Sequence, residues 1–134
     1  MSVKAQPPQI GLTEPRTDAW TKALGKEKFA ADAYPENFLW AGVKRSDQAH
    51  ARLLGLDLGR AESIPGVRAV LIHRDAPAPN RHGFAFKDTP VLVDDKVRRQ
   101  GDALALVLAE NRDALKKSLE EIKVSLDPLP GVVD

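Results

Sequence analysis

The side chains in this sequence that are best suited to acid–base or metal chemistry are its three histidines, His50, His73 and His82. None of them forms an H-x-H or H-x-x-x-H pair, and no carboxylate lies at ligand spacing on the same element, whereas a protein zinc site needs three or four ligands. The sequence therefore predicts no metal site. His50 shares a strand face with Arg52, so we expect a solvated or backbone-bonded histidine, with an interdomain contact as the alternative.

The adjacent aspartates Asp94 and Asp95 form the candidate pair of catalytic carboxylates. A glycosidase or a cation site needs two carboxylates that are aimed at one point. Adjacent aspartates between strands more often build a turn, because an aspartate side chain accepts hydrogen bonds from nearby backbone amides. We therefore predict a turn at this pair.

Other signatures of catalysis or ligand binding are missing from the sequence, which contains no G-x-S-x-G, P-loop or G-x-G-x-x-G motif. Arg98 and Arg99 could bind an anion, but neighbouring strand residues point to opposite faces, so the two do not make one patch. Trp40 stands in an apolar strand and is predicted to lie in the core. We predict no catalytic, cofactor-binding or metal-binding residue in this chain.

Composition narrows the class of protein further. The chain has 134 residues, the size of one domain, and its net charge of +1 argues against a nucleic-acid partner. It has no cysteine, which excludes thiolate ligation of metals or iron–sulfur clusters and is compatible with the cytoplasm that we predict. The longest apolar run, residues 103–109, is far shorter than the about twenty residues of a membrane-spanning helix, so we expect no membrane partner.

Apolar patterning predicts an α+β (mixed α/β) fold with bent strands and two helices packed on a sheet. The expected strands cover residues 38–44, 49–56, 67–72, a short piece that starts at 89, the central strand 103–109, and 122–126. In the second strand the alternation changes phase, which predicts a bulge near residues 53–55. The helices are expected at residues 59–66, where Asp57 can cap the start, and from Asn111 to about Ile122.

Two segments are expected to lack regular structure. Residues 1–22 contain Pro7, Pro8 and Pro15 and are predicted to form an extended arm or linker, which Trp20 could anchor. Residues 73–90, rich in proline and glycine, are predicted to form a long loop of the kind that often serves binding or interfaces. The domain proper is then expected at residues 23–134.

Five motifs in order resemble the N-terminal a/b hammerhead domain of the molybdopterin-binding subunit in the xanthine dehydrogenase and aldehyde oxidase family of molybdenum hydroxylases. The family patterns G-x-A-x-(Y/F)-x-x-D, R-S-P-H-A-H-A, L-P-G-V, D-D-K-V-R-Y-V-G-Q-P-V-A and L-P-x-V-x-D correspond here to residues 25–32, 45–51, 64–67, 94–105 and 129–134. His50 matches the second histidine of R-S-P-H-A-H-A. The sequence departs from the family at Asp47 and Gln48 and again across residues 99–103, so the resemblance carries no substrate.

In that family this domain precedes the large domains that hold the molybdopterin cofactor, and the iron–sulfur clusters lie in a separate domain or subunit. The resemblance therefore implies a fragment of a larger oxidoreductase, with the molybdopterin-binding and iron–sulfur domains as its partners. The fragment itself is then expected to hold no cofactor and to have no catalytic activity, although the parent enzyme does.

Three functions remain open at this stage. The first is a non-catalytic structural domain of a molybdenum hydroxylase. The second is a free-standing ligand- or protein-binding module with the same fold. The third is a small enzyme whose site converges on Asp94, Asp95 and His50.

Overall fold

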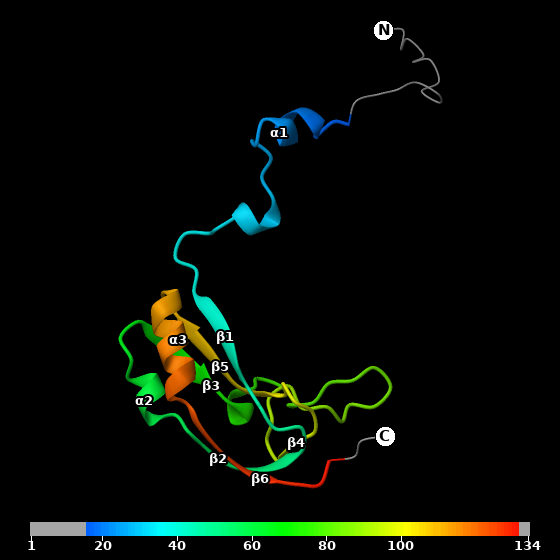
Figure 1. Cartoon of the computed structure of the whole chain (residues 1–134), viewed down its shortest axis with the longest axis vertical. Coiled ribbons are helices and arrows are strands. Elements are labelled where there is room, and N and C mark those ends of the chain that lie inside the picture. Colours follow the sequence, from blue (N-terminus) through cyan, green and yellow to red (C-terminus); the bar gives the residue numbers. More distant parts are fainter. Residues whose placement is uncertain (1–15, 132–134) are drawn as a thin grey trace. The chain divides into compact units, whose positions relative to one another are not determined.

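The computed structural model describes residues 16–131, and the chain divides into two compact units, Met1–Glu36 and Asn37–Asp134 (Figure 1). In the first unit, helix α1 (Ala19–Ala23) and the 3-10 helix η1 (Ala30–Asp32) have no buried residue. Lys22 and Asp18, one helical turn apart, form an ion pair of 2.5 Å that supports α1.

The structure differs from the predicted extended arm in the part of the arm that it describes. Residues 19–22 are helical rather than extended, because the Asp18 pair stabilises a local helical turn. Trp20, the suggested anchor, is 75% exposed within this unit. The three prolines lie outside the described residues, and the boundary after residue 22 stays a prediction.

The second unit contains two three-stranded antiparallel sheets. One has the order β1 (Trp40–Arg45), β5 (Ala103–Ala109), β3 (Val67–Leu71), and the other has the order β4 (Lys96–Val97), β2 (Ala51–Asp57), β6 (Lys123–Pro128). Helices α2 (Gly59–Glu62) and α3 (Arg112–Glu121) contact each other, and α3 lies across β1 and β5 (Figure 1). The predicted mixed fold is confirmed, although its strands form two sheets rather than one.

Strand β5 links the two halves of the core, as its run of apolar residues predicts. It lies between β1 and β3, and it contributes side chains to both hydrophobic clusters. Ala105 and Val107 pack in the cluster under the helices, whereas Leu104 packs with Val93 and Val97 in the cluster of the second sheet. The prediction of a central strand is confirmed, and Leu104, Ala105 and Val107 are buried, but Leu106 and Leu108 stay partly exposed, so one face of the strand is only partly covered.

The bend predicted in β2 is confirmed by its register against β6. Leu53 pairs with Leu126 and Gly55 pairs with Ser125, so one residue of β2 is left over between them. That residue, Leu54, is 65% exposed. After this extra residue, the side chains of β2 again alternate between core and solvent. Leu56 therefore faces the core and contacts both hydrophobic clusters.

Helix α3 begins where its predicted cap, Asn111, places it, whereas the N-cap position of α2 is Leu58 rather than the predicted Asp57, which lies one residue earlier. The Asn111 side chain accepts a hydrogen bond of 2.8 Å from the Ala114 amide, and the Asp57 carboxylate accepts one of 3.2 Å from the Gly59 amide. Helix α2 ends at Glu62 rather than near residue 66, because the Ser63 hydroxyl donates to the carbonyls of its last turn. Among residues 16–131, no helix is long and apolar enough to cross a membrane.

The long loop predicted after β3 is present. The prediction of a short strand that starts at residue 89 is wrong, because no strand precedes β4 in this stretch. After the 3-10 helix η2 (His73–Asp75), Thr89 forms only an isolated bridge with His82, and regular pairing resumes at Lys96. Pro90 has no amide hydrogen for a ladder. The backbone N–H and C=O of Leu92 are both bonded to the Asn80 side chain, at 3.0 and 2.6 Å, and so are not free for a strand partner.

Candidate functional site

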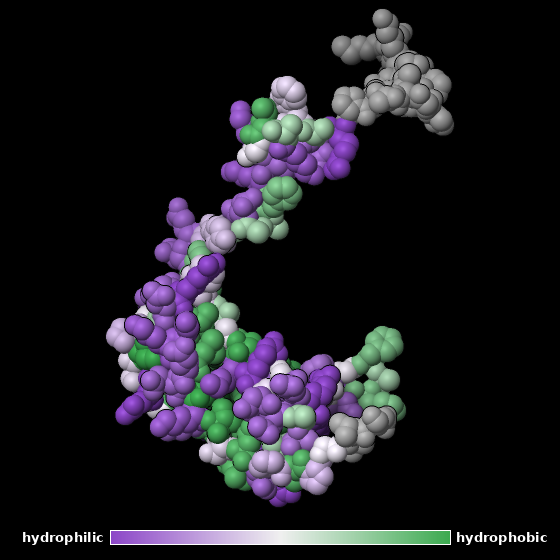
Figure 2. Space-filling view, viewed as in Figure 1, coloured by the Kyte–Doolittle hydropathy of each residue, from purple (hydrophilic) through white to green (hydrophobic). Residues whose placement is uncertain are grey.

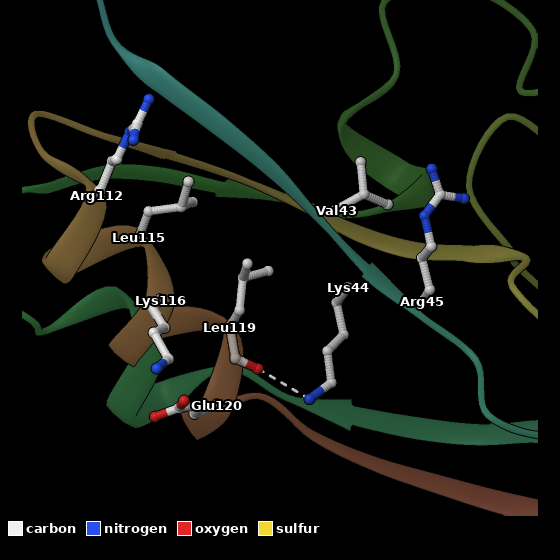
Figure 3. Close-up of a pocket in the computed structure, with 8 residues that line it drawn as sticks. All are labelled: Val43, Lys44, Arg45, Arg112, Leu115, Lys116, Leu119 and Glu120. Atoms are coloured by element: carbon white, nitrogen blue, oxygen red, sulfur yellow. Dashed lines mark hydrogen bonds between the residues drawn. The ribbon is translucent and has the colours of Figure 1, made fainter.

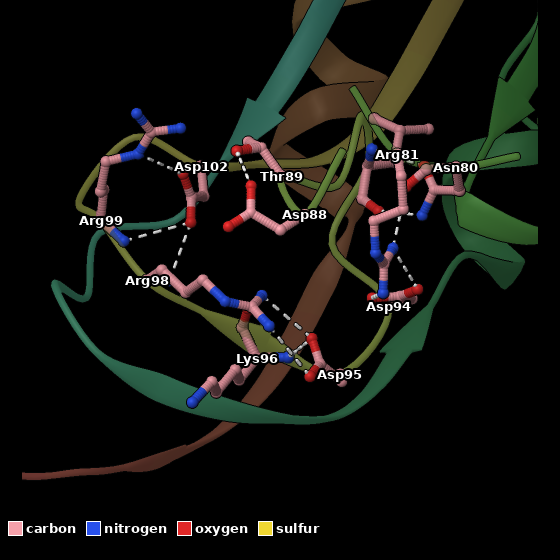
Figure 4. Close-up of polar contacts among 11 residues, drawn as sticks. Asn80, Arg81, Asp88, Thr89, Asp94, Asp95, Lys96, Arg98, Arg99 and Asp102 are labelled. Atoms are coloured by element: carbon pink, nitrogen blue, oxygen red, sulfur yellow. Dashed lines mark hydrogen bonds and ion pairs between the residues drawn. The ribbon is translucent and has the colours of Figure 1, made fainter. Parts of the chain in front are cut away.

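The two aspartates considered as a catalytic pair point to different partners. Asp94 receives a two-pronged ion pair from Arg81, at 2.7 and 3.2 Å, and this guanidinium lowers the pKa of the Asp94 carboxyl below its ordinary value (Figure 4). Asp95 accepts a 2.6 Å bond from the Lys96 amide and is paired with Arg98. Asp95 thus binds a nearby backbone amide as expected, but at a bend of the chain rather than in a hydrogen-bonded turn, whereas Asp94 braces a loop.

Arg81 and Asn80 belong to a set of contacts, here called the loop clamp, that joins residues 80–82 to residues 89–94. It comprises the Arg81–Asp94 ion pair (Figure 4), the two bonds between the Asn80 side chain and the Leu92 backbone, and the two backbone bonds between His82 and Thr89. The sequence prediction missed this clamp. The partners of Asn80 and Arg81 lie twelve and thirteen residues away, and no local spacing reveals such a pairing.

The arginines that suggested an anion site are both engaged in the turn before β5. Arg98 is paired with Asp95, and Arg99 is paired with Asp102 at 3.4 Å (Figure 4). Asp102 also accepts hydrogen bonds from the backbone amides of both arginines, at 2.8 and 3.1 Å. Asp102 therefore orders the turn, and the two guanidinium groups bind separate carboxylates.

His50 bonds to the backbone, as the simplest interpretation of the sequence predicts. Its Nδ1 lies 2.8 Å from the carbonyl oxygen of Pro130, and its own carbonyl accepts a 3.0 Å bond from the Leu129 amide. A carbonyl can only accept, so Nδ1 carries the proton in this contact. His50 thus fastens the chain beyond β6, and the side chains of His50, Asp94 and Asp95 each bind a different partner.

The remaining histidines are separate from each other and from His50. His73 lies in η2 beside the β2 bulge, and its Nδ1 is buried without a hydrogen-bond partner. His82 is exposed within the loop clamp. Within residues 16–131, no group of three histidine, aspartate or glutamate side chains could hold a metal ion.

A groove of about 310 Å³ runs between β1 and α3 (Figure 3). Leu115, Leu119 and Val43 make its apolar wall, and four cationic side chains with one glutamate line its edge. The Lys44 ammonium donates a 2.8 Å bond to the Leu119 carbonyl, which satisfies one of the last carbonyls of α3. The groove thus offers an apolar contact surface with a charged rim.

Trp40 was predicted to lie in the core, and this prediction is wrong. It is the first residue of β1, an edge strand, and remains partly exposed. The Arg112 guanidinium stacks over its ring at 4.1 Å, and Phe38 meets it edge-on at 5.1 Å. The tryptophan is therefore covered by a cation rather than by the core.

Comparison with known proteins finds a family whose sequences match most of this chain. Residues 24–130 match the family described as aldehyde oxidase and xanthine dehydrogenase, a/b hammerhead domain. The chain is 44% identical to the nicotinate dehydrogenase large molybdopterin subunit of Eubacterium barkeri over 123 residues, which are 92% of this chain and 29% of that protein.

Solved structures agree with the sequence match. The reconstituted CO dehydrogenase from Oligotropha carboxidovorans superposes with a TM-score of 0.80 at 31% identity, over 92% of this chain and 16% of that one. The aldehyde oxidoreductase from Desulfovibrio desulfuricans gives a TM-score of 0.75 at 36% identity, over 87% of this chain and 14% of that one. This chain thus spans less than a third of the relatives that it matches.

Proposed function

The chain belongs to the a/b hammerhead domain family of aldehyde oxidases and xanthine dehydrogenases, and we propose that it acts as a non-catalytic structural domain of a molybdenum-dependent oxidoreductase. The proposal includes the arm or linker at residues 1–22, the domain at 23–134 and a cytoplasmic location. Its partners are the molybdopterin-binding and iron–sulfur parts of the same enzyme.

The observation that carries this proposal is the use of the candidate catalytic side chains within the fold. His50, Asp94 and Asp95 each bind a different element of the domain itself. Asp94 lines a pocket together with His73, but its carboxylate is held there by the Arg81 guanidinium. The residues present also do not fit a cofactor-holding role. The sequence has no cysteine for an iron–sulfur cluster, and the described residues contain no ligand cluster.

Co-purification tests the proposal. The chain carries an affinity tag and is produced in its native host, and the recovered material is analysed for molybdenum, iron and associated polypeptides. We expect a complex that contains molybdenum and oxidises at least one member of a panel of nicotinate, purines, aldehydes and carbon monoxide. The isolated 134-residue chain is expected to turn over none of them. Recovery of the tagged chain without a molybdenum polypeptide would contradict the proposal and favour the free-standing binding module.

A second measurement separates the structural role from a catalytic one. His50→Ala removes the imidazole, and Lys117→Ala is a matched control on the exposed face of α3. In the assembled enzyme we expect kcat to stay within about twofold of wild type for both variants. General acid–base groups typically contribute 10²–10⁴-fold, so a loss of about a hundredfold in His50→Ala alone would refute the non-catalytic assignment.

A further inference from the structure

The tip of the long loop displays two phenylalanines to solvent. Phe84 is 109% exposed and Phe86 is 78% exposed, with only Ala85 between them. Figure 2 shows hydrophobic atoms at the end of the loop that leaves the body of the second unit between η2 and β4. Clustered apolar side chains on a surface commonly mark an interface, and aromatic residues are enriched among those that dominate binding. These three residues, 84–86, are called the Phe tip below.

The loop that carries the Phe tip is braced at its base. The loop clamp closes it with the Arg81–Asp94 ion pair, the Asn80 bonds to Leu92 and the paired backbone bonds of His82 and Thr89. A partner that meets a braced loop loses less conformational entropy on binding than one that must order a free segment. The fold thus holds the aromatic tip out before any partner arrives.

Gly83 makes the tip compact. Its φ of +153° is one that residues with a side chain rarely adopt, and a Cβ placed there would lie 1.7 Å from the Phe86 carbonyl oxygen. Only glycine fits such an approach, because the atoms would otherwise overlap. The backbone therefore doubles back tightly, and Phe84 and Phe86 are presented from one short turn.

We propose that the Phe tip is a docking anchor that inserts into an apolar pocket of the molybdopterin-binding part of the parent enzyme. This inference rests on the proposed function above. The relatives are several times longer than this chain, so most of each such polypeptide lies outside the matched domain and is available to cover the tip. Residues 84–86 themselves carry no charge, and the two charges that follow directly, on Lys87 and Asp88, are of opposite sign. The aromatic side chains of the tip thus suit an apolar pocket of a protein.

A cysteine scan tests this contact directly, since the chain contains no cysteine of its own. Phe84→Cys and Phe86→Cys, made singly, each place one thiol at the tip, and Lys117→Cys places a control thiol on the exposed face of α3. Each variant is treated with N-ethylmaleimide, as the isolated chain and as the assembled enzyme, and the modified peptide is quantified by mass spectrometry. We expect the tip thiols to react at least tenfold more slowly in the assembled enzyme, with the control unchanged within twofold.

A second variant measures the contribution of the tip to assembly. In Phe84→Ser/Phe86→Ser, we expect the affinity of the isolated chain for the separately produced molybdopterin-binding part of the enzyme to fall at least tenfold, because each buried aromatic anchor contributes strongly to binding. Phe29→Ser, an exposed phenylalanine in the first unit, is the matched control. Thermal unfolding of the isolated variants confirms that each still folds, because the tip makes little contact with the core.

The other outcomes overturn the inference in distinguishable ways. Tip thiols that react equally fast in a molybdenum-containing complex would contradict this inference but not the proposed function. Recovery of no molybdenum polypeptide would contradict both. Protection of the tip in the isolated chain that rises with protein concentration would identify a second copy as the occupant. Protection by phosphatidylglycerol vesicles alone would identify a lipid surface instead.

Discussion

Replacing Ser118 with alanine should destabilise the second unit, because this hydroxyl joins its two helices. Ser118 lies in the middle of α3, is 0% exposed, and donates a hydrogen bond of 3.1 Å to the carbonyl oxygen of Ala61 in α2. A neutral hydrogen bond contributes about 0.5–1.5 kcal/mol net, and a buried acceptor left without its donor costs about 1–3 kcal/mol. Alanine fits the space, so no steric strain is added. We therefore expect a loss of about 1.5 kcal/mol.

The assay is equilibrium unfolding of the 134-residue chain by urea and by heat, followed by circular dichroism. For a unit of this size, about 1.5 kcal/mol corresponds to a decrease in Tm of roughly 6–12 °C. Ser125→Ala is the matched control, because Ser125 is exposed on β6 and should change the free energy of unfolding by less than about 0.5 kcal/mol. If Ser118→Ala unfolds at the same temperature as that control, the hydroxyl does not hold α2 to α3 and the reasoning is refuted.

Three further perturbations have defined outcomes. Leu104→Ala, at a position that is 1% exposed in the second cluster, should lower the free energy of unfolding by about 2–5 kcal/mol in the same urea titration. Asn111→Ala should cost about 1 kcal/mol of stability while Asn111→Asp retains the cap, and equal losses in the two variants would argue against capping. Asp94→Asn should flatten the acid side of the stability profile. Because the pKa of Asp94 is lower in the folded state, its ionised carboxylate contributes stability above the unfolded pKa near 4, and this contribution is lost as the pH falls through the folded pKa. A stability profile that the substitution leaves unchanged below pH 4 would show that Arg81 does not stabilise this carboxylate.

The elements with strong local signals could be predicted from the sequence. The uninterrupted apolar run of β5 identifies a buried central strand, and the phase change after Leu53 identifies the bulge in β2. Asn111 marks the start of α3 because an asparagine side chain caps a helix through amides only three residues ahead. Each of these signals depends on residues that are close in the chain.

The candidate site was less accessible to such reasoning. The sequence shows that Asp94 and Asp95 are neighbours. It does not show that each carboxylate binds a different arginine, Arg81 for Asp94 and Arg98 for Asp95. It also assigned Trp40 to the core, since an apolar run does not show which strand lies at the edge of a sheet. The two phenylalanines of the loop carried a usable signal, because apolar residues are unexpected in a stretch rich in proline and glycine.

By itself, the sequence determined the types of element, the exclusion of cysteine chemistry and the family, because periodicity, composition and motif order are properties of the chain alone. The tertiary structure decided that the strands divide into two sheets, that Arg81 and Asn80 close the long loop, and that Phe84 and Phe86 are held in solvent at its tip. The physical reason is that a side chain selects its partner by distance in space. That distance is set by the path of the whole chain, which brings residues 80–82 against residues 89–94 and leaves the residues between them outside.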